Sequence, residues 1–153
     1  MTFARNIEIS KYRDGFTLTE VLIVVGILAV VFAFAIGVGI NFYGGQAVVS
    51  ERDTLVNVLR AARGRALNNF DESSHGVFIA AAQYVLFEGN SYASRNQDFD
   101  SVFPRGKGLT MSGLSEVVFN APQGDANASG TITLSNDLGN AKININNEGR
   151  IDW

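Results

Sequence analysis

Residues Gly15 to Glu20 read GFTLTE and stand directly before a long apolar stretch. No charged residue occurs from Val21 to Ser50, and Val21 to Ile36 is apolar apart from Gly26. A helix that crosses a hydrocarbon layer of ~30 Å needs about 20 apolar residues at 1.5 Å rise each. The sequence therefore predicts one membrane-spanning helix over residues 16–40.

The cations around this stretch predict its orientation. Arg5, Lys11 and Arg13 precede the apolar segment, whereas the first cation after it is Arg52. Positive charge is retained on the cytoplasmic side of single spans. We expect a cytoplasmic amino terminus, a single pass through the cytoplasmic membrane, and an exported remainder.

Glu20 is the residue that a plain membrane anchor does not explain. A carboxylate inside a membrane costs about 2.5–3.5 kcal/mol on insertion scales. One alternative places Glu20 at the interface near a helix start, where the dipole favours an anion by about 0.3–1 kcal/mol. A secretory signal peptide cut after Ala35 is a further alternative, but the apolar run continues past that position.

The GFTLTE stretch, after a short charged leader and before an unbroken apolar helix, resembles the cleavage and assembly signal of type IV pilins and type II secretion pseudopilins. The resemblance implies that a prepilin peptidase cuts between Gly15 and Phe16, removes residues 1–15 and methylates the new amino terminus at Phe16. It also implies that Glu20 meets the cationic amino terminus of a neighbouring subunit. Thr19 departs from the aliphatic residue that is common in that family.

The helical pattern continues beyond the apolar stretch. Residues 41–69 are predicted to form an amphipathic half of the same helix, with Glu51, Asp53, Arg60 and Arg63 largely on other faces. Its apolar positions fall at helical spacings: Val48, Leu55, Leu59, Ala62 and Ala66. The segment LRAARGRALNN from Leu59 to Asn69 resembles the helix end of H-type minor pseudopilins, and its arginines are interpreted as a solvated helix end.

After Asn69 the helical period is lost, and residues 70–153 predict an extracytoplasmic β-rich head. Ile132 with Leu134, and Ile143 with Ile145, should face one side of the sheet. The predicted antiparallel strands are residues 76–80, 83–87, 116–119, 131–134, 142–145 and 150–153, with a tight turn at 147–149. The expected fold class is α+β and pilin-like: a long amino-terminal helix packed on an antiparallel β-sheet.

The longest irregular stretch of the predicted head is Tyr92 to Gly108. It carries five charged residues: Arg95, Asp98, Asp100, Arg105 and Lys107. Loops of that length are often functional or mobile. We interpret this stretch as a candidate partner contact.

Composition excludes several kinds of chemistry. The chain has no cysteine, which rules out disulfides and thiolate sites, and its 12 Lys and Arg against 15 Asp and Glu give a net charge of -3. No basic stripe follows a phosphate backbone, so nucleic acid is not predicted as the primary partner, although a role in DNA uptake stays open.

Two motifs suggest chemistry without specifying it. His75, the only histidine, lies beside Ser73, Ser74 and Asp71. An exported hydrolase that uses His75 is conceivable, but the preferred interpretation is a histidine on a surface turn. No enzyme activity and no catalytic residue is therefore predicted.

Residues 125–130, DANASG, resemble the first half of a calcium loop, with Asp125, Asn127 and Ser129 as weak candidate ligands. The closing position is Asn136 rather than Glu, so a polar hairpin loop without cofactor is favoured.

The sequence as a whole predicts a prepilin-like subunit that a prepilin peptidase processes and that assembles through its helix into a type II secretion pseudopilus or a type IV pilus. Within the filament it is expected to be a minor subunit. Expected partners are the peptidase, other pilin or pseudopilin subunits and the inner-membrane assembly platform. The alternative is a single-span anchored extracytoplasmic binding module that does not polymerise.

Overall fold

The computed structural model describes residues 15–153, with the side chains of residues 35–44 left out. The chain divides into two compact units at a boundary after Gly39. The leader expected over residues 1–15 lies outside the described residues except for Gly15. The boundaries that the sequence suggests at residues 15, 40 and 69 stay predictions.

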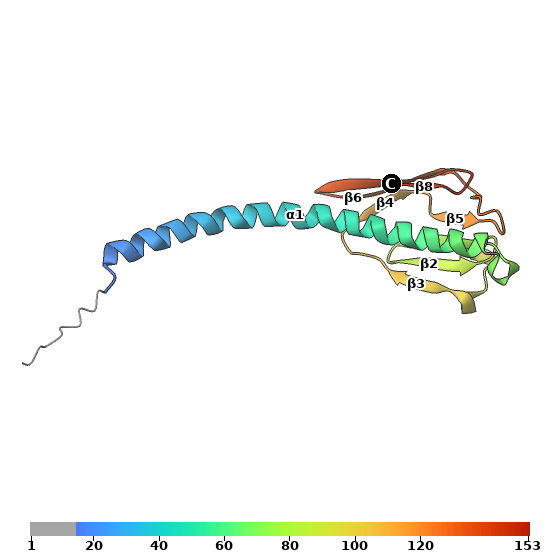
Figure 1. The fold of residues 1–153 in the computed structure, drawn as a ribbon, viewed down its shortest axis with the longest axis horizontal. Coiled ribbons are helices and arrows are strands. Elements are labelled where there is room, and N and C mark those ends of the chain that lie inside the picture. Colours follow the sequence, from blue (N-terminus) through green and yellow to red (C-terminus); the bar gives the residue numbers. More distant parts are fainter. Residues whose placement is uncertain (1–14) are drawn as a thin grey trace, which may run out of the picture. The chain divides into compact units, whose positions relative to one another are not determined.

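A single α-helix, α1, runs from Leu18 to Leu67 (Figure 1). Its first part belongs to the first unit, where the side chains from Val21 to Phe34 are exposed. Within the residues that the structure describes, no helix combines the length and the apolarity needed to cross a membrane. The span expected over residues 16–40 is therefore a prediction that the structure does not confirm.

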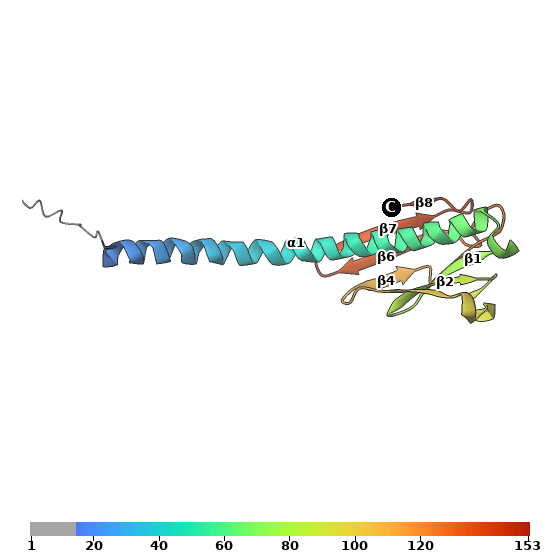
Figure 2. The same cartoon turned by 60° about the horizontal axis from the view of Figure 1, so that its bottom comes forward.

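The second unit contains two antiparallel four-stranded sheets (Figures 1 and 2). The first has the order β3-β2-β1-β5 and the second the order β4-β6-β7-β8. The strands are β1 His75–Ile79, β2 Gln83–Glu88, β3 Ser101–Pro104, β4 Thr110–Gly113, β5 Glu116–Phe119, β6 Gly130–Asn136, β7 Gly139–Ile145 and β8 Ile151–Asp152. The predicted α+β class is confirmed, and each of the six predicted strands corresponds to an observed one.

The second part of α1 packs on both sheets around one core, and in Figures 1 and 2 this part, coloured green, lies against the strands. The five apolar helix positions expected to face the sheet, Val48, Leu55, Leu59, Ala62 and Ala66, are at most 2% exposed. Alternation in β6 and β7 is also confirmed, because Ile132, Leu134 and Ile143 are fully buried. Burial of these faces positions the charged residues discussed below.

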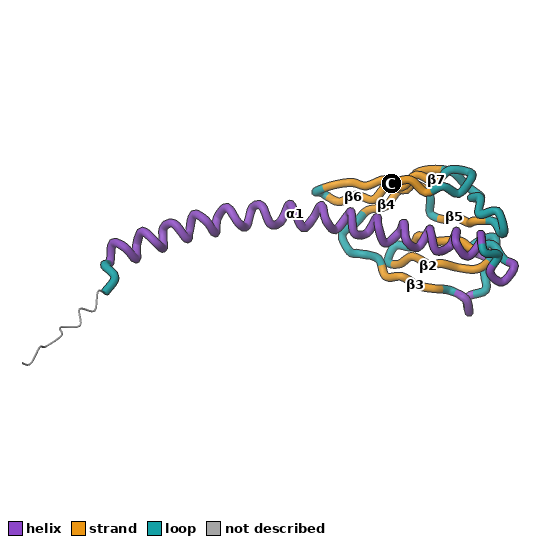
Figure 3. Tube along the Cα trace, viewed as in Figure 1, coloured by secondary structure: helices purple, strands orange, loops and turns teal. Residues whose placement is uncertain are grey.

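The interpretation of residues 92–108 as irregular is wrong. This stretch forms two 3-10 turns, η2 Tyr92–Ser94 and η3 Gln97–Phe99, and then β3, which pairs with β2 (Figure 3). The polar strand β4 was missed as well. Both strands are four residues long and contain no buried residue, and neither carries the apolar alternation by which sequence patterns indicate strands.

Candidate processing and assembly site

The Gly15–Phe16 peptide bond lies in the non-helical segment that immediately precedes α1. Gly15 is exposed, and the side chain of Phe16 is 83% exposed. The backbone N–H and C=O groups inside a helix are hydrogen-bonded to one another, whereas those ahead of the first turn are not. A peptidase therefore need not break helical hydrogen bonds to bind this segment. The bond at which cleavage is expected is therefore open to a peptidase.

Thr17 caps the start of α1. Its hydroxyl oxygen Oγ1 accepts a hydrogen bond from the backbone N–H of Glu20 at 3.2 Å, and its carbonyl accepts from the N–H of Val21 at 3.2 Å. Thr and Glu three positions apart have the spacing of a capping box. This spacing was visible in the sequence, and it locates the first helical turn without reference to any family.

Glu20 occupies that first turn. The partial positive charge of a helix amino terminus favours a carboxylate there, which agrees with the alternative that places Glu20 at a helix start. The same residue also borders an apolar groove of about 230 Å³ lined by Phe16, Val21, Val24 and Val25. A helix packed into this groove would remove the Glu20 carboxylate from water. A position at a helix start is therefore compatible with pairing of Glu20 to a neighbouring subunit.

Glu51 was expected on the polar face of the helix, and that expectation is wrong. It is 8% exposed, and its Oε1 accepts a hydrogen bond from the Tyr84 hydroxyl at 2.7 Å. Its Oε2 accepts from the N–H of Gly106 at 3.1 Å. Burial, followed by the Glu51 carboxylate, raises the pKa of Tyr84 far above its usual value, so the hydroxyl stays a donor. We call these three residues the Glu51 clasp, which joins α1 to β2 and to the segment after β3.

His75 was expected on a surface turn, but it is 1% exposed at the start of β1. Its Nδ1 donates a hydrogen bond to the carbonyl of Ser73 at 3.0 Å, and the ring lies 6.0 Å from that of Phe70. Burial lowers the pKa of His75. In the described part of the chain His75 contacts no serine hydroxyl through a hydrogen bond. The geometry is that of a packed core histidine.

The candidate calcium residues serve the loop between β5 and β6. Asp125 Oδ2 accepts a hydrogen bond from Asn120 at 3.2 Å, and Asn127 Oδ1 accepts from the N–H of Val118 at 2.9 Å. Ser129 is exposed. Among the residues that the structure describes, no three His, Cys, Asp or Glu side chains cluster as metal ligands. The favoured interpretation, a polar loop without cofactor, therefore stays a prediction, and calcium binding by the three weak candidate residues is not tested.

Arg95, one of the charged residues of the 92–108 stretch, contacts other residues of the same stretch. The ring of Tyr92 stacks on Phe78 of β1 with centroids 3.9 Å apart, and the guanidinium of Arg95 lies 3.6 Å from the Tyr92 centroid. Arg95 also pairs with Asp100 at 2.9 Å, and both side chains are mostly buried. Tyr92 therefore packs residues 92–100 against β1, which is a structural role; a partner contact in the 92–108 stretch is not tested.

Comparison with known proteins places a family match on this site. Residues 10–36 match the family described as the prokaryotic N-terminal methylation motif. No curated protein and no solved structure matches the chain. The match covers Gly15, Phe16 and Glu20, so the chain carries a prepilin-type processing signal at the segment where the structure leaves the backbone open.

Proposed function

We propose that the chain is a prepilin-type subunit that is cut between Gly15 and Phe16, methylated at Phe16, and assembled through α1 into a type II secretion pseudopilus or a type IV pilus. One observation carries the proposal: the methylation motif matched over residues 10–36 coincides with an exposed bond directly before a capped helix. A short recognition motif followed by accessible backbone is what a processing peptidase requires.

Cleavage would place the new amino group one residue before the capping Thr17. A cation at a helix amino terminus opposes the dipole, so the freed amine of Phe16 favours a nearby carboxylate. Glu20 of a neighbouring subunit would supply it, and pairing at low dielectric offsets part of the cost of each buried charge. Under this proposal residues 16–40 lie in the cytoplasmic membrane before assembly, with the head outside the cytoplasm.

The head would then act by contact rather than by chemistry. Its core histidine and its loop carboxylates are engaged in packing and hydrogen bonds, which supports a structural or binding role. The partners proposed are other subunits and the inner-membrane assembly platform. A minor position in the filament, as in H-type pseudopilins, agrees with the pattern of Leu59 to Asn69. The second candidate is a single-span anchored module that does not polymerise.

Mass spectrometry of the mature amino terminus tests the processing step. The full chain is coexpressed with a prepilin peptidase, and we expect a product that begins at Phe16 and carries one added methyl group. The matched variant Gly15→Val should remain uncut, because a branched side chain replaces hydrogen next to the scissile bond. A native product that retains Met1, or one trimmed near Ala35, would refute the proposal.

A further inference from the structure

Three arginines line one cavity of the second unit. Arg60 and Arg63 come from α1, and Arg150 directly precedes β8. The cavity measures about 270 Å³, and its wall is completed by Gly64, Leu67 and Ile151. Positions 60, 63, 64 and 67 share one helix face. The sequence suggested solvated arginines at a helix end, whereas the structure brings two of them together with Arg150, which directly precedes the last strand.

Two of these three guanidinium groups lack a carboxylate partner in the described part of the chain. Arg63 donates to two neutral carbonyls, Gly124 O at 3.2 Å and Glu148 O at 2.9 Å. Arg60 lies over the ring of Trp153, 4.0 Å from its centroid, and makes no hydrogen bond within the described residues. Arg52 and Arg95, in contrast, each pair with an aspartate.

The third arginine is only loosely neutralised. Arg150 pairs with Asp152 at 2.9 Å, but their side chains are 70% and 52% exposed. Exposed pairs contribute little and exchange readily with solvent ions. The cavity therefore has an excess of positive charge, and Arg63 is held in place by acceptors that leave its charge uncompensated.

We propose that this cavity binds a carboxylate side chain of a protein partner, in a segment where Asp or Glu stands next to an apolar residue. Guanidinium groups match carboxylates in two-point hydrogen bonds. The apolar neighbour would contact Leu67 of the cavity wall, which is 47% exposed, or Trp153 beside Arg60, which is 49% exposed. Apolar contact area of this kind favours a peptide over a bare inorganic anion, which would make no such contact.

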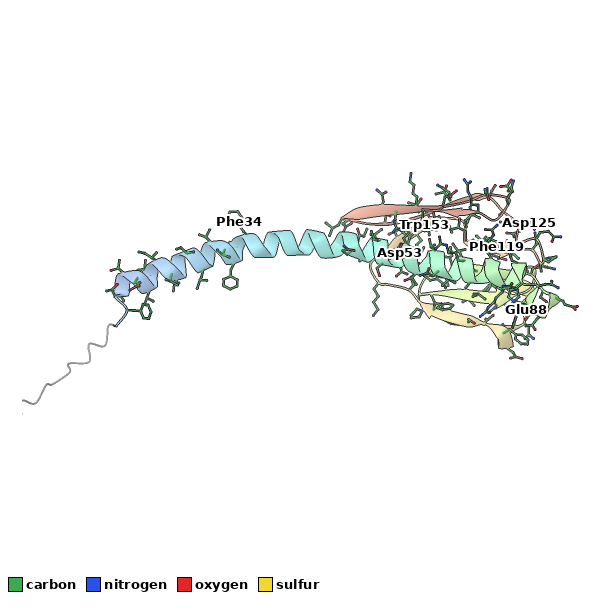
Figure 4. All side chains as sticks on the ribbon, in the orientation of Figure 1. Phe34, Asp53, Glu88, Phe119, Asp125 and Trp153 are labelled. Carbon is green, nitrogen blue, oxygen red and sulfur yellow. The ribbon has the colours of Figure 1, made fainter. Side chains whose placement is uncertain are left out.

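Trp153 makes the site directly measurable. It is the only tryptophan of the sequence, and Figure 4 labels it beside α1. A carboxylate that draws Arg60 away from the ring changes the surroundings of the indole, so emission should shift on binding. The full chain in detergent is titrated with the blocked peptide Gly-Phe-Asp-Glu-Gly, and calorimetry on the same samples measures binding independently of the fluorescence.

We expect saturable binding of the acidic peptide and at least about tenfold weaker binding of its neutral counterpart Gly-Phe-Asn-Gln-Gly, a difference of about 1.4 kcal/mol at 25 °C. The variant Arg60→Gln should lose affinity by a similar factor. Arg60 is exposed and makes no hydrogen bond within the described residues, so the substitution should leave the fold intact. Arg52→Gln is the matched control, because it removes the same charge from an exposed pair with Asp53 outside the cavity.

Three results would overturn the proposal. Equal affinity for the neutral peptide would show that the carboxylate is not recognised. Inorganic phosphate that binds as tightly as the acidic peptide would identify a site for free anions instead. The absence of heat and emission change up to about 1 mM acidic peptide would mean that no useful site exists. None of these results depends on whether Gly15 is cleaved, so failure here is distinct from failure of the processing proposal.

Discussion

Substitution of Tyr84 by Phe isolates the energetic contribution of the Glu51 clasp. The change removes only the hydroxyl that donates to Glu51 at 2.7 Å, and it keeps the ring in a fully buried position. No side-chain volume beyond one oxygen is lost, so the cavity term of a large-to-small substitution is negligible. The remaining effect is the loss of one donor from a buried carboxylate.

The expected cost is about 2 kcal/mol. Hydrogen bonds to charged groups contribute about 1.5–3 kcal/mol, because the group left behind has no water to replace the lost donor. Glu51 retains the N–H of Gly106, so the carboxylate is not stripped of every partner. This keeps the estimate below the cost of an entirely unpaired buried charge, which is about 3–5 kcal/mol.

Urea unfolding of the full chain in detergent measures this cost, with Trp153 fluorescence as the signal from the second unit. At a slope of about 2 kcal/mol per molar urea, the midpoint should fall by about 1 M. Tyr92→Phe is the matched control: the Tyr92 hydroxyl makes no hydrogen bond in the described part of the chain, so its removal should leave the midpoint unchanged.

A double-mutant cycle with Glu51→Gln separates the charged hydrogen bond from other effects of the substitution. The cost of Tyr84→Phe should be smaller in the Gln background, because the hydroxyl then donates to a neutral amide oxygen and the bond is weaker. A midpoint for Tyr84→Phe within error of the unsubstituted chain, together with zero coupling, would refute the assignment of Glu51 as a buried, clasped carboxylate.

Two further predictions address His75 and Glu20. Burial lowers the pKa of His75 in the folded state, so the unfolded chain, in which the pKa is about 6.5, binds more protons at low pH. The free energy of unfolding should therefore fall as the pH drops from about 7.5 to about 5.5. The variant His75→Gln should show a smaller difference between the urea midpoints at these two pH values. An equal slope in the variant would contradict a buried His75. Glu20→Gln keeps the shape of the side chain and should still be cut, but it should enter filaments poorly if charge pairing drives assembly. Thr17→Ala removes the helix cap alone and should assemble normally, so the yields of sheared filaments from the two variants are compared. Normal incorporation of Glu20→Gln would count against the charge pairing.

Local pattern was sufficient for much of the fold because each signal lies within a few residues. The helical spacing of Val48, Leu55 and Leu59 predicted which face of α1 is buried, and the alternation around Ile132 and Ile143 predicted which faces of β6 and β7 meet it. The methylation motif is equally local, since it is matched within the contiguous residues 10–36. The short strands β3 and β4 were not predicted, because four residues with no buried position carry too little periodicity.

The sequence by itself therefore determined the helix, most of the strands and the presence of a methylation motif over residues 10–36, because periodicity and short motifs need no knowledge of what lies opposite. Only the tertiary structure decided which polar residues are buried and which charges converge. Glu51 meets donors 33 and 55 residues away, and Arg63 meets carbonyls 61 and 85 residues away. Such pairings depend on how two sheets close over one helix face, and that closure leaves no local signal in the chain.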